Sequence, residues 1–260
     1  MAWVAIFIIV PLLLMAYFAF TDSDGNFTIV NISEVAKFGP VFLRSVLLAA
    51  AATVICLLMA YPLAFRMSRL NPRYQSLFMM LIMLPMWMNY LLRTYAWMAL
   101  LEHNGLINKA LGLIGIGPFQ MINTEGAIVL GMVYNYLPFM ILPLYAVMVK
   151  IDRSMIEAAQ DLGAGFVLTF GKVVIPLSKP GIMTGITMTF VPAVSTFIIS
   201  RMLGGGANFL IGDLIEIQFL GNAYNPHLGS AISLILMICI LLSMALLNQF
   251  DSDETEGMMV

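Results

Sequence analysis

Long apolar stretches without charge recur along the whole chain, and they constrain the fold more than any other feature. Of 260 residues, 61% are hydrophobic and only 10% are charged, whereas soluble domains carry roughly 25% charged residues. A helix needs about 20 apolar residues to cross the hydrocarbon core of a bilayer. Inside that core every backbone polar group must be paired within the protein, which favours helices. The sequence therefore predicts an all-α membrane protein.

Six apolar windows predict six transmembrane helices in a single domain, residues 1–260. The windows cover residues 1–20, 44–66, 73–101, 126–149, 179–201 and 228–250. Arg93, in the third window, is the charge closest to the interior of a span. Arginine side chains near helix ends extend to the membrane surface, so we expect Arg93 to reach towards the outer face.

Lysine and arginine residues in the short loops predict the orientation, because cytoplasmic loops carry an excess of both. Basic residues cluster in the loops after the second and fourth windows, at Arg66, Arg69, Arg73, Lys150, Arg153, Lys172 and Lys179. The loops on the other side are poorer in basic residues. We therefore expect these two loops, and both termini, to be cytoplasmic.

A polar segment, residues 150–180, interrupts the apolar chain and cannot lie in hydrocarbon. Ser154 and Glu157 have the spacing of a helix capping box, and Gly163 suits a helix end. The segment therefore predicts a short helix on the cytoplasmic surface. Docking into a groove of another protein is one function of such a helix, and an ordinary connection between spans is the alternative.

The same segment carries a spaced motif, E-A-A, then glycine, then I-P-L-x-x-P. Its residues are Glu157, Ala158, Ala159, Gly163, Ile175, Pro176, Leu177 and Pro180, and Asp161 lies between its first two parts. This motif resembles the signature of binding-protein-dependent ABC importer permeases with the MetI-like fold. The resemblance implies that the segment is a coupling helix that enters a cleft of a separate ATPase subunit. It also implies that the chain itself is no enzyme and holds no cofactor.

Further segments resemble the spermidine/putrescine branch of that family. They are residues 137–140, 143–145, 157–164, 192–193, 203–206, 210–213 and 218–220. This resemblance implies a bacterial-type cytoplasmic membrane and a polyamine substrate. It implies as partners a second homologous permease subunit in a heterodimer, two ATP-binding cassette ATPase subunits and an extracytoplasmic substrate-binding protein. A permease for another small solute, such as a metal cation, an anion or a sugar, is the alternative.

Aromatic and neutral polar side chains in the third and fourth windows are candidates for a substrate pathway. A slender polycation with methylene spacers is suited by aromatic faces, which attract cations, and by neutral oxygens. The candidates are Trp87, Asn89, Tyr90, Tyr134, Asn135 and Tyr136. Interfacial aromatic belts are the alternative interpretation.

Two carboxylates in the outer segment after the fifth window are candidates for the mouth of the pathway. Asp213 and Glu216 are three residues apart, so they share one face of a helix. We expect them to attract the cation, and solvated loop residues are the alternative.

Other function classes fit the sequence less well. A net charge of −2 lacks the basic footprint of nucleic-acid-binding proteins. His103 and His227 are isolated in the sequence, so we expect no metal site. An ion-coupled secondary transporter is the rival from another class, but such proteins place ionisable groups within the membrane. The interiors of the six windows contain no aspartate or glutamate.

Overall fold

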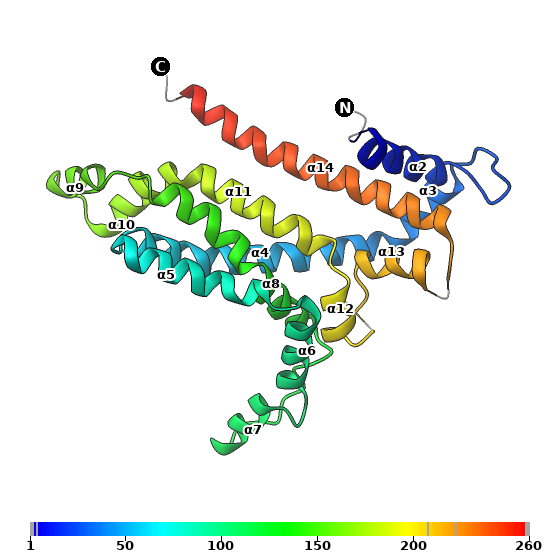
Figure 1. Ribbon diagram of the computed structural model, residues 1–260, viewed down its shortest axis with the longest axis horizontal. Coiled ribbons are helices and arrows are strands. Elements are labelled where there is room, and N and C mark those ends of the chain that lie inside the picture. Colours follow the sequence, from blue (N-terminus) through cyan, green and yellow to red (C-terminus); the bar gives the residue numbers. More distant parts are fainter. Residues whose placement is uncertain (1–2, 4, 207, 222, 258–260) are drawn as a thin grey trace.

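The computed structural model describes residue 3 and residues 5–206, 208–221 and 223–257. Across these residues the regular structure is helical, and a single isolated bridge joins Thr21 to Phe27. Long helices lie side by side in an elongated bundle, and one pair of helices projects from it (Figure 1). The expectation of an all-α fold is confirmed.

Three long helices form the centre of the bundle. They are α4 (Gly39–Ser68), α8 (Glu125–Met148) and α11 (Ile175–Val194), and both α4 and α11 pack against α8. Glycines let α11 approach closely. A side-chain carbon at Gly185 would lie 2.7 Å from the sulfur of Met140, and one at Gly181 would lie 3.0 Å from the carbonyl oxygen of Pro143. Small residues at helix contacts are typical of membrane bundles.

The remaining helices cover this centre. The C-terminal helix α14 (Pro226–Gly257) packs against α2 (Val10–Ala19), which follows the short π-helical turn η1 (Ala5–Ile9). Two short helices, α3 (Val30–Val35) and η2 (Ala36–Phe38), lead into α4. At the end of the bundle that we call the α13 end lie α12 (Ile198–Leu203) and α13 (Ile211–Leu220).

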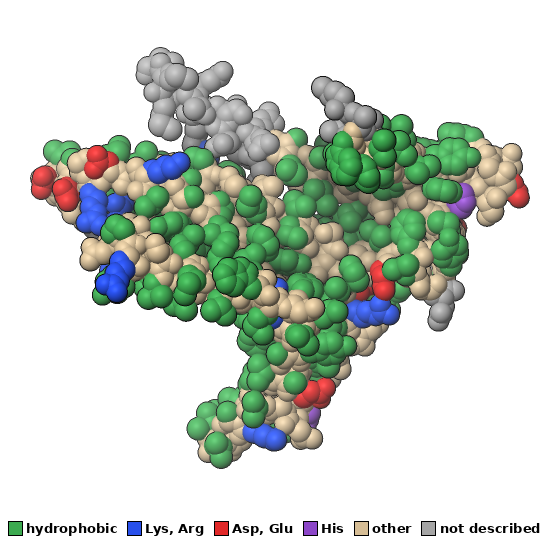
Figure 2. All heavy atoms as spheres, in the orientation of Figure 1, with side chains coloured by type: hydrophobic (Ala, Val, Ile, Leu, Met, Phe, Trp, Pro, Cys, Tyr) green, Lys and Arg blue, Asp and Glu red, His purple; other side chains and the backbone are tan. Residues whose placement is uncertain are grey.

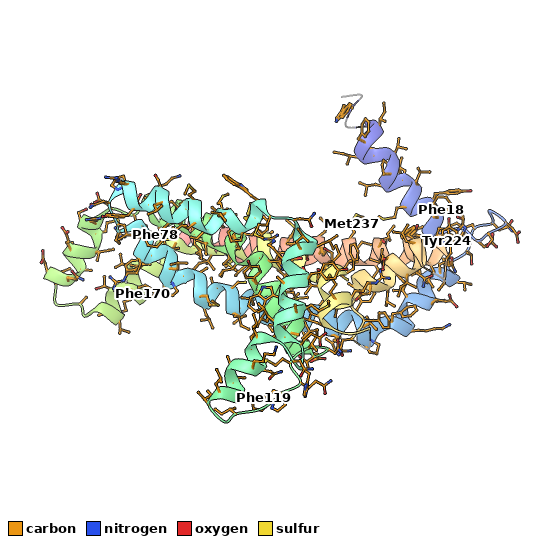
Figure 3. All side chains as sticks on the ribbon, turned by 60° about the horizontal axis from the view of Figure 1, so that its bottom comes forward. Phe18, Phe78, Phe119, Phe170, Tyr224 and Met237 are labelled. Carbon is orange, nitrogen blue, oxygen red and sulfur yellow. The ribbon has the colours of Figure 1, made fainter. Side chains whose placement is uncertain are left out.

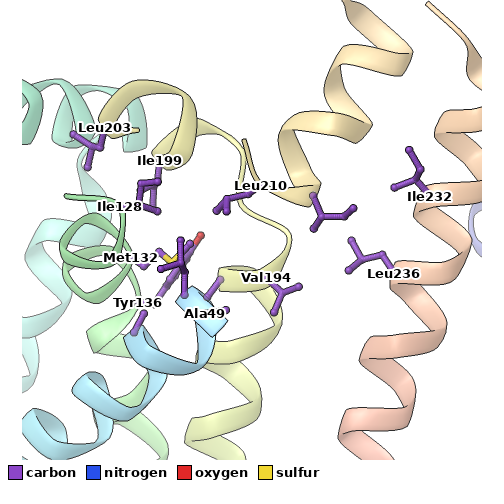
Figure 4. Close-up of a cluster of buried hydrophobic side chains, with 14 of the residues drawn as sticks. Ala49, Ile128, Met132, Tyr136, Val194, Ile199, Leu203, Leu210, Ile232 and Leu236 are labelled. Atoms are coloured by element: carbon purple, nitrogen blue, oxygen red, sulfur yellow. The ribbon is translucent and has the colours of Figure 1, made fainter. Parts of the chain in front are cut away.

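Two clusters of buried apolar side chains follow one another along the bundle. The first joins α8, α12, α13 and α14 at the α13 end, and Figure 4 labels its members Ile128, Met132, Ile199, Leu203, Leu210 and Ile232. The second lies between α4 and α8 nearer the opposite end and includes Cys56, Ala60, Met140, Leu144 and Met148. Together they fix α8 as the central helix.

Three described helical segments are long and apolar enough to cross a membrane by themselves. They are Val30–Ser68, Glu125–Met148 and Pro226–Ala245, and a bent helix pair makes a fourth if the pair counts as one span. The shorter apolar helix Ile6–Ala19 covers most of the first predicted window, and α11 overlaps the fifth. The count of six spans stays a prediction.

The third predicted window, residues 73–101, is not one continuous helix, and that expectation is wrong. The segment Pro72–Trp87 and the segment Tyr90–Leu113 meet at an angle of 89°. Pro85 lies in the 3-10 turn η3 (Leu84–Trp87) that ends α5 (Pro72–Met83). Two residues beyond that turn, Asn89 begins the next helix by accepting a hydrogen bond from the backbone N–H of Leu91 at 2.8 Å. Proline and a capping asparagine both interrupt a helix.

The chain beyond the bend leaves the bundle. It forms α6 (Tyr90–Leu101) and α7 (Leu106–Leu113), which point away from the long helices. Figure 3 shows Phe119 on this projecting part, whereas Phe170 lies at one end of the bundle of long helices. Phe119 is tied back to α7, because its backbone N–H donates to the side-chain oxygen of Asn108 at 3.0 Å.

The end of the bundle opposite the α13 end carries the polar segment, and we call it the α9 end. It contains α9 (Arg153–Asp161), α10 (Phe166–Thr169) and the π-helical turn η4 (Phe170–Val174), which runs directly into α11. The ring of Phe170 packs edge-on against Tyr61 and Phe65 of α4, with centroid distances of 5.3 and 5.5 Å. Figure 2 shows charged side chains gathered at this end, while apolar side chains cover the long helices.

Candidate coupling helix and substrate pathway

The coupling-helix candidate α9 is a surface helix. Glu157, Ala158, Asp161 and Gly163 are exposed, and Ala159 is half-buried. Large apolar side chains beside them are exposed as well: Met155 is 47%, Leu162 89% and Val167 83% exposed. A polar helix flanked by uncovered apolar side chains has the composition of a docking element.

The start of α9 differs from the sequence prediction. The capping residue is Asp152, whose carboxylate accepts a hydrogen bond from the backbone N–H of Ser154 at 3.0 Å. The predicted capping box of Ser154 and Glu157 is therefore wrong, because Asp152 already satisfies the first turn. The same hydrogen bond lowers the pKa of the exposed Asp152 carboxyl below its ordinary value.

The end of α9 follows the sequence prediction. Gly163 has φ +82°, a conformation that glycine adopts without steric cost. Its backbone N–H donates to the carbonyl of Gln160 at 2.9 Å, and that of Ala164 donates to Ala159 at 3.0 Å. Pro176 and Pro180 lie in the first two turns of α11 and are exposed.

Two of the pathway candidates lie at the α5–α6 bend. The ring of Trp87, the last residue of η3, is 81% exposed. The side chain of Asn89 is exposed too, and its oxygen is occupied by the hydrogen bond from Leu91.

Two other candidates meet at the end of α11. The hydroxyl of Tyr136 donates to the carbonyl oxygen of Pro192 at 3.2 Å, and the hydroxyls of Tyr90 and Thr196 lie 3.5 Å apart. Because α11 ends at Val194, these side chains surround the carbonyl end of a helix, which carries a partial negative charge. We call Tyr90, Tyr136 and Thr196 the hydroxyl cluster.

Sequence reasoning missed Thr196. The sequence contains a weak indication of its position, because Pro192 precedes two hydroxyl residues, Ser195 and Thr196, at the end of the fifth window. Such a series is typical of a helix end, and a helix end inside an apolar segment leaves carbonyl groups available.

The other two candidates on α8 face different surroundings from Tyr136. The ring of Tyr134 lies edge-on to Trp97 with centroids 5.3 Å apart. Asn135 is buried, and its amide donates to the carbonyl of Gly131 at 2.9 Å, while its side-chain oxygen has no partner among the described residues. Consecutive helix residues point about 100° apart, so the predicted cluster of residues 134–136 is divided.

Tyr134 and Trp97 also line an apolar cavity of about 630 Å³. The rest of its lining is apolar and comes from α4 and α8: Ile55, Met59, Gly126, Val129, Leu130, Val133 and Leu137. α6 therefore lies against α8 at two places. Trp97 of α6 contacts Tyr134 of α8, and Tyr90 of α6 lies near Tyr136 of α8.

The two candidate carboxylates do not form a free pair. Asp213 is 2% exposed, and one of its oxygens accepts a hydrogen bond at 2.7 Å from the backbone N–H of Leu210 at the start of α13. Glu216 pairs with Arg201 at 2.5 Å. Acidic residues in a first turn satisfy free N–H groups, which explains the burial of Asp213. A role for both at the mouth stays a prediction.

Arg93 does not reach outwards, and that expectation is wrong. It is 8% exposed, and its guanidinium carbon lies 5.8 Å from the centroid of the Tyr90 ring. The aromatic face offers the buried cation an attractive contact close to its own helix. Within the described residues, no group of three histidine, cysteine, aspartate or glutamate side chains is placed to hold a metal ion.

Comparison with known proteins places these features in a family. The family described as binding-protein-dependent transport system inner membrane component matches residues 52–254. The spermidine/putrescine transport system permease protein PotB of Haemophilus influenzae is 38% identical over 253 residues, which cover 93% of this chain and 87% of that protein. PotB of Escherichia coli K12 is 35% identical over 246 residues, covering 91% and 89%.

A structural comparison agrees. A chain from the crystal structure of a bacterial ABC transporter involved in the import of the acidic polysaccharide alginate superposes with a TM-score of 0.81. The match covers 97% of this chain and 92% of that chain at 15% identity, so it shows the fold alone. On its sequence match and its fold, the chain belongs to the inner-membrane permeases of binding-protein-dependent ABC importers.

Proposed function

We propose that this chain forms half of the translocation pathway of a polyamine importer, with spermidine or putrescine as substrate. Both relatives named above are spermidine/putrescine permeases, and each match covers more than nine-tenths of this chain. The observation that carries the substrate assignment is the hydroxyl cluster at the carbonyl end of α11. Neutral oxygens and a partial negative charge suit an ammonium group.

The neighbouring aromatic pair supports the same substrate class. Trp97 and Tyr134 line an apolar cavity, which suits the methylene spacers of a polyamine. An ammonium group over an aromatic face gains about 0.5–2 kcal/mol. Trp87, Asn89 and Asn135 would serve the pathway from the α5–α6 bend and from the buried side of α8. Asp213 and Glu216 would serve the mouth by exchanging their present partners, Leu210 and Arg201, for the cation.

ATP hydrolysis by a separate ATPase subunit would drive transport. Glu157, Ala158, Ala159, Asp161 and Gly163 would dock in a groove of that subunit, and Pro176 and Pro180 would set the start of α11. The full assembly would contain a second, homologous permease subunit, two ATPase subunits and an extracytoplasmic binding protein. Both termini would be cytoplasmic. The C-terminal end of α14 and α9 lie towards the same end of the molecule (Figure 1), which supports this topology for the C-terminus.

The test is uptake of labelled putrescine and spermidine by the reconstituted complex, with and without ATP. Tyr136→Phe removes the hydroxyl that bonds Pro192 and whose oxygen would accept a hydrogen bond from the ammonium group, and one such bond is worth about 0.5–1.5 kcal/mol. We therefore expect the KM for uptake to rise about threefold to tenfold. Tyr145→Phe is the matched control, because it removes a hydroxyl of the same helix that bonds Gln75 instead. Equal kinetics for the two variants, or no ATP-dependent polyamine uptake by the wild type, would refute the assignment.

A further inference from the structure

A groove of about 260 Å³ lies between the end of α4 and the coupling helix α9. None of the pathway candidates lines it. Its lining residues are Phe65, Arg69, Arg153, Ile156, Glu157 and Gln160, and we call it the basic groove.

Arg69 is fixed in the wall of this groove but is only partly satisfied. One of its terminal nitrogens donates to the carbonyl of Ile151 at 3.2 Å, and its guanidinium carbon lies 5.4 Å from the centroid of the Phe65 ring. Its Nε and its other terminal nitrogen are shielded from solvent and have no hydrogen-bond partner among the described residues. Buried polar groups of folded proteins are normally paired, so the half-buried Arg69 side chain has hydrogen-bond donors that the described residues leave unused.

A second guanidinium stands beside the first. A terminal nitrogen of Arg153 donates to the backbone carbonyl of Arg69 at 2.9 Å, which holds two positive charges next to each other. Burial, and then the charge of Arg153, lower the pKa of Arg69 below its ordinary value. The site therefore disfavours its own positive charge, and an anion between the two side chains would relieve this.

Glu157 is the carboxylate in the lining, and it does not fill this role. It is exposed, and it forms no ion pair with either arginine among the described contacts. It follows Arg153 by four residues on the same helix face, with the basic residue first, which is the less favourable order for pairing. Glu157 is thus available to a docking partner, and the two arginines remain without an anion.

We propose that the basic groove binds a phosphate group through Arg69 and Arg153. The planar fork of a guanidinium matches two oxygens of a phosphate, and the groove has room for one such group. Arg69 follows α4 directly and Arg153 begins α9. A bound phosphate would therefore bridge α4 and the coupling helix and restrict the movement of α9.

The phosphate has two possible sources, a free anion or the headgroup of an anionic phospholipid. The test uses the assembled complex without nucleotide, in nanodiscs of phosphatidylcholine. Its thermal unfolding midpoint is measured during titration with sodium phosphate, against sodium chloride of equal ionic strength. A second series replaces part of the phosphatidylcholine with phosphatidylglycerol in chloride. Stabilisation by phosphate assigns the free anion, and stabilisation by phosphatidylglycerol alone assigns the lipid.

Variants test whether the stabilisation by phosphate arises in the basic groove. Arg153→Gln should weaken the stabilising titration about tenfold or more, because a hydrogen bond to a charged group is lost. Arg73→Gln is the matched control, since it removes the same charge from an exposed neighbour that does not line the groove. Glu157→Gln should strengthen the titration, because it removes a negative charge from the wall.

Three results would overturn the proposal. One is that neither phosphate nor phosphatidylglycerol stabilises the wild-type complex more than chloride does. Another is that Arg153→Gln and Arg73→Gln alter the titration equally. The third is that Arg153→Gln leaves the titration unchanged but releases the ATPase subunit, which would make the groove a docking site for a carboxylate. These readouts do not depend on which solute the complex transports.

Discussion

The α9 end and the hydroxyl cluster are built in opposite ways. α9 comes from nine consecutive residues and is mostly exposed, and Arg153 in its first turn donates a hydrogen bond to the carbonyl of Arg69 just after α4. The hydroxyl cluster draws its members from α6, α8 and the segment after α11, and two of them are 106 residues apart in the chain. The proposed docking element is thus encoded locally, whereas the proposed pathway depends on how distant helices pack. The two regions should respond differently to substitution.

The largest expected effect concerns backbone packing near the hydroxyl cluster. A side-chain carbon at Gly212 would lie 2.5 Å from the carbonyl oxygens of both Ser195 and Thr196. Backbone atoms cannot move aside as a flexible side chain can, so Gly212→Ala should lower the free energy of unfolding by about 3 kcal/mol. Thermal unfolding in detergent measures this change.

Gly171→Ala at the α9 end is the matched control. A side-chain carbon there meets open space, and we expect a change within about 0.5 kcal/mol. Equal stability of the two variants would remove the proposed contrast between a tightly packed region and a loosely held one.

A smaller effect on stability, but a large one on transport, is expected at the end of α9. Nothing lies within 4 Å of a side-chain carbon at Gly163, yet φ is +82°. Gly163→Val would therefore add strain of about 1–2 kcal/mol without a clash. We expect the complex to assemble but uptake to fall at least tenfold, together with substrate-stimulated ATP hydrolysis.

Gly165→Val controls for the added side chain, because Gly165 also faces open space and its φ is not positive. Equal uptake by Gly163→Val and Gly165→Val would contradict a coupling role for the backbone conformation at Gly163. If Gly163→Val prevented assembly, α9 would be a structural element of the bundle rather than a coupling element.

The smallest expected effect is the acid sensitivity of α9. Because the folded-state pKa of Asp152 is lowered, its contribution is complete above its unfolded pKa, near 3.8. The contribution is lost as the pH falls through the lower folded value. The protection of the first-turn amides against hydrogen exchange, relative to their intrinsic exchange rate at each pH, should therefore fall in acid. Asp152→Asn caps the helix without titrating, so the same loss of protection in this variant would exclude the carboxyl as its cause.

Features set by neighbouring residues could be predicted from the sequence. The helix in residues 150–180 and its end at Gly163 follow from local preferences. The capping prediction failed because Asp152, two residues before Ser154, is an equally good cap. The bend at Met88 and Asn89 was missed because average hydropathy does not register one proline and one capping asparagine in an apolar segment.

Long-range contacts could not be predicted in the same way. Nothing near Thr196 in the sequence indicates Tyr90, and nothing near Asp213 indicates burial. The division of residues 134–136 was foreseeable in part, because helix geometry separates adjacent side chains. Which of the two tyrosines meets Trp97 depends on the angle between α6 and α8, and this angle follows from the bend.

The direct continuation of η4 into α11 has a mechanical consequence. From Ile175 to Val194, α11 spans about 30 Å at 1.5 Å per residue. Its first turn is joined covalently to the α9 end, and its last turn carries the carbonyl of Pro192 that holds Tyr136. Its glycine contacts with α8 lie between these ends. The helix is thus a lever with its fulcrum on α8, and a tilt imposed at one end must displace the other in the opposite direction unless α11 itself bends.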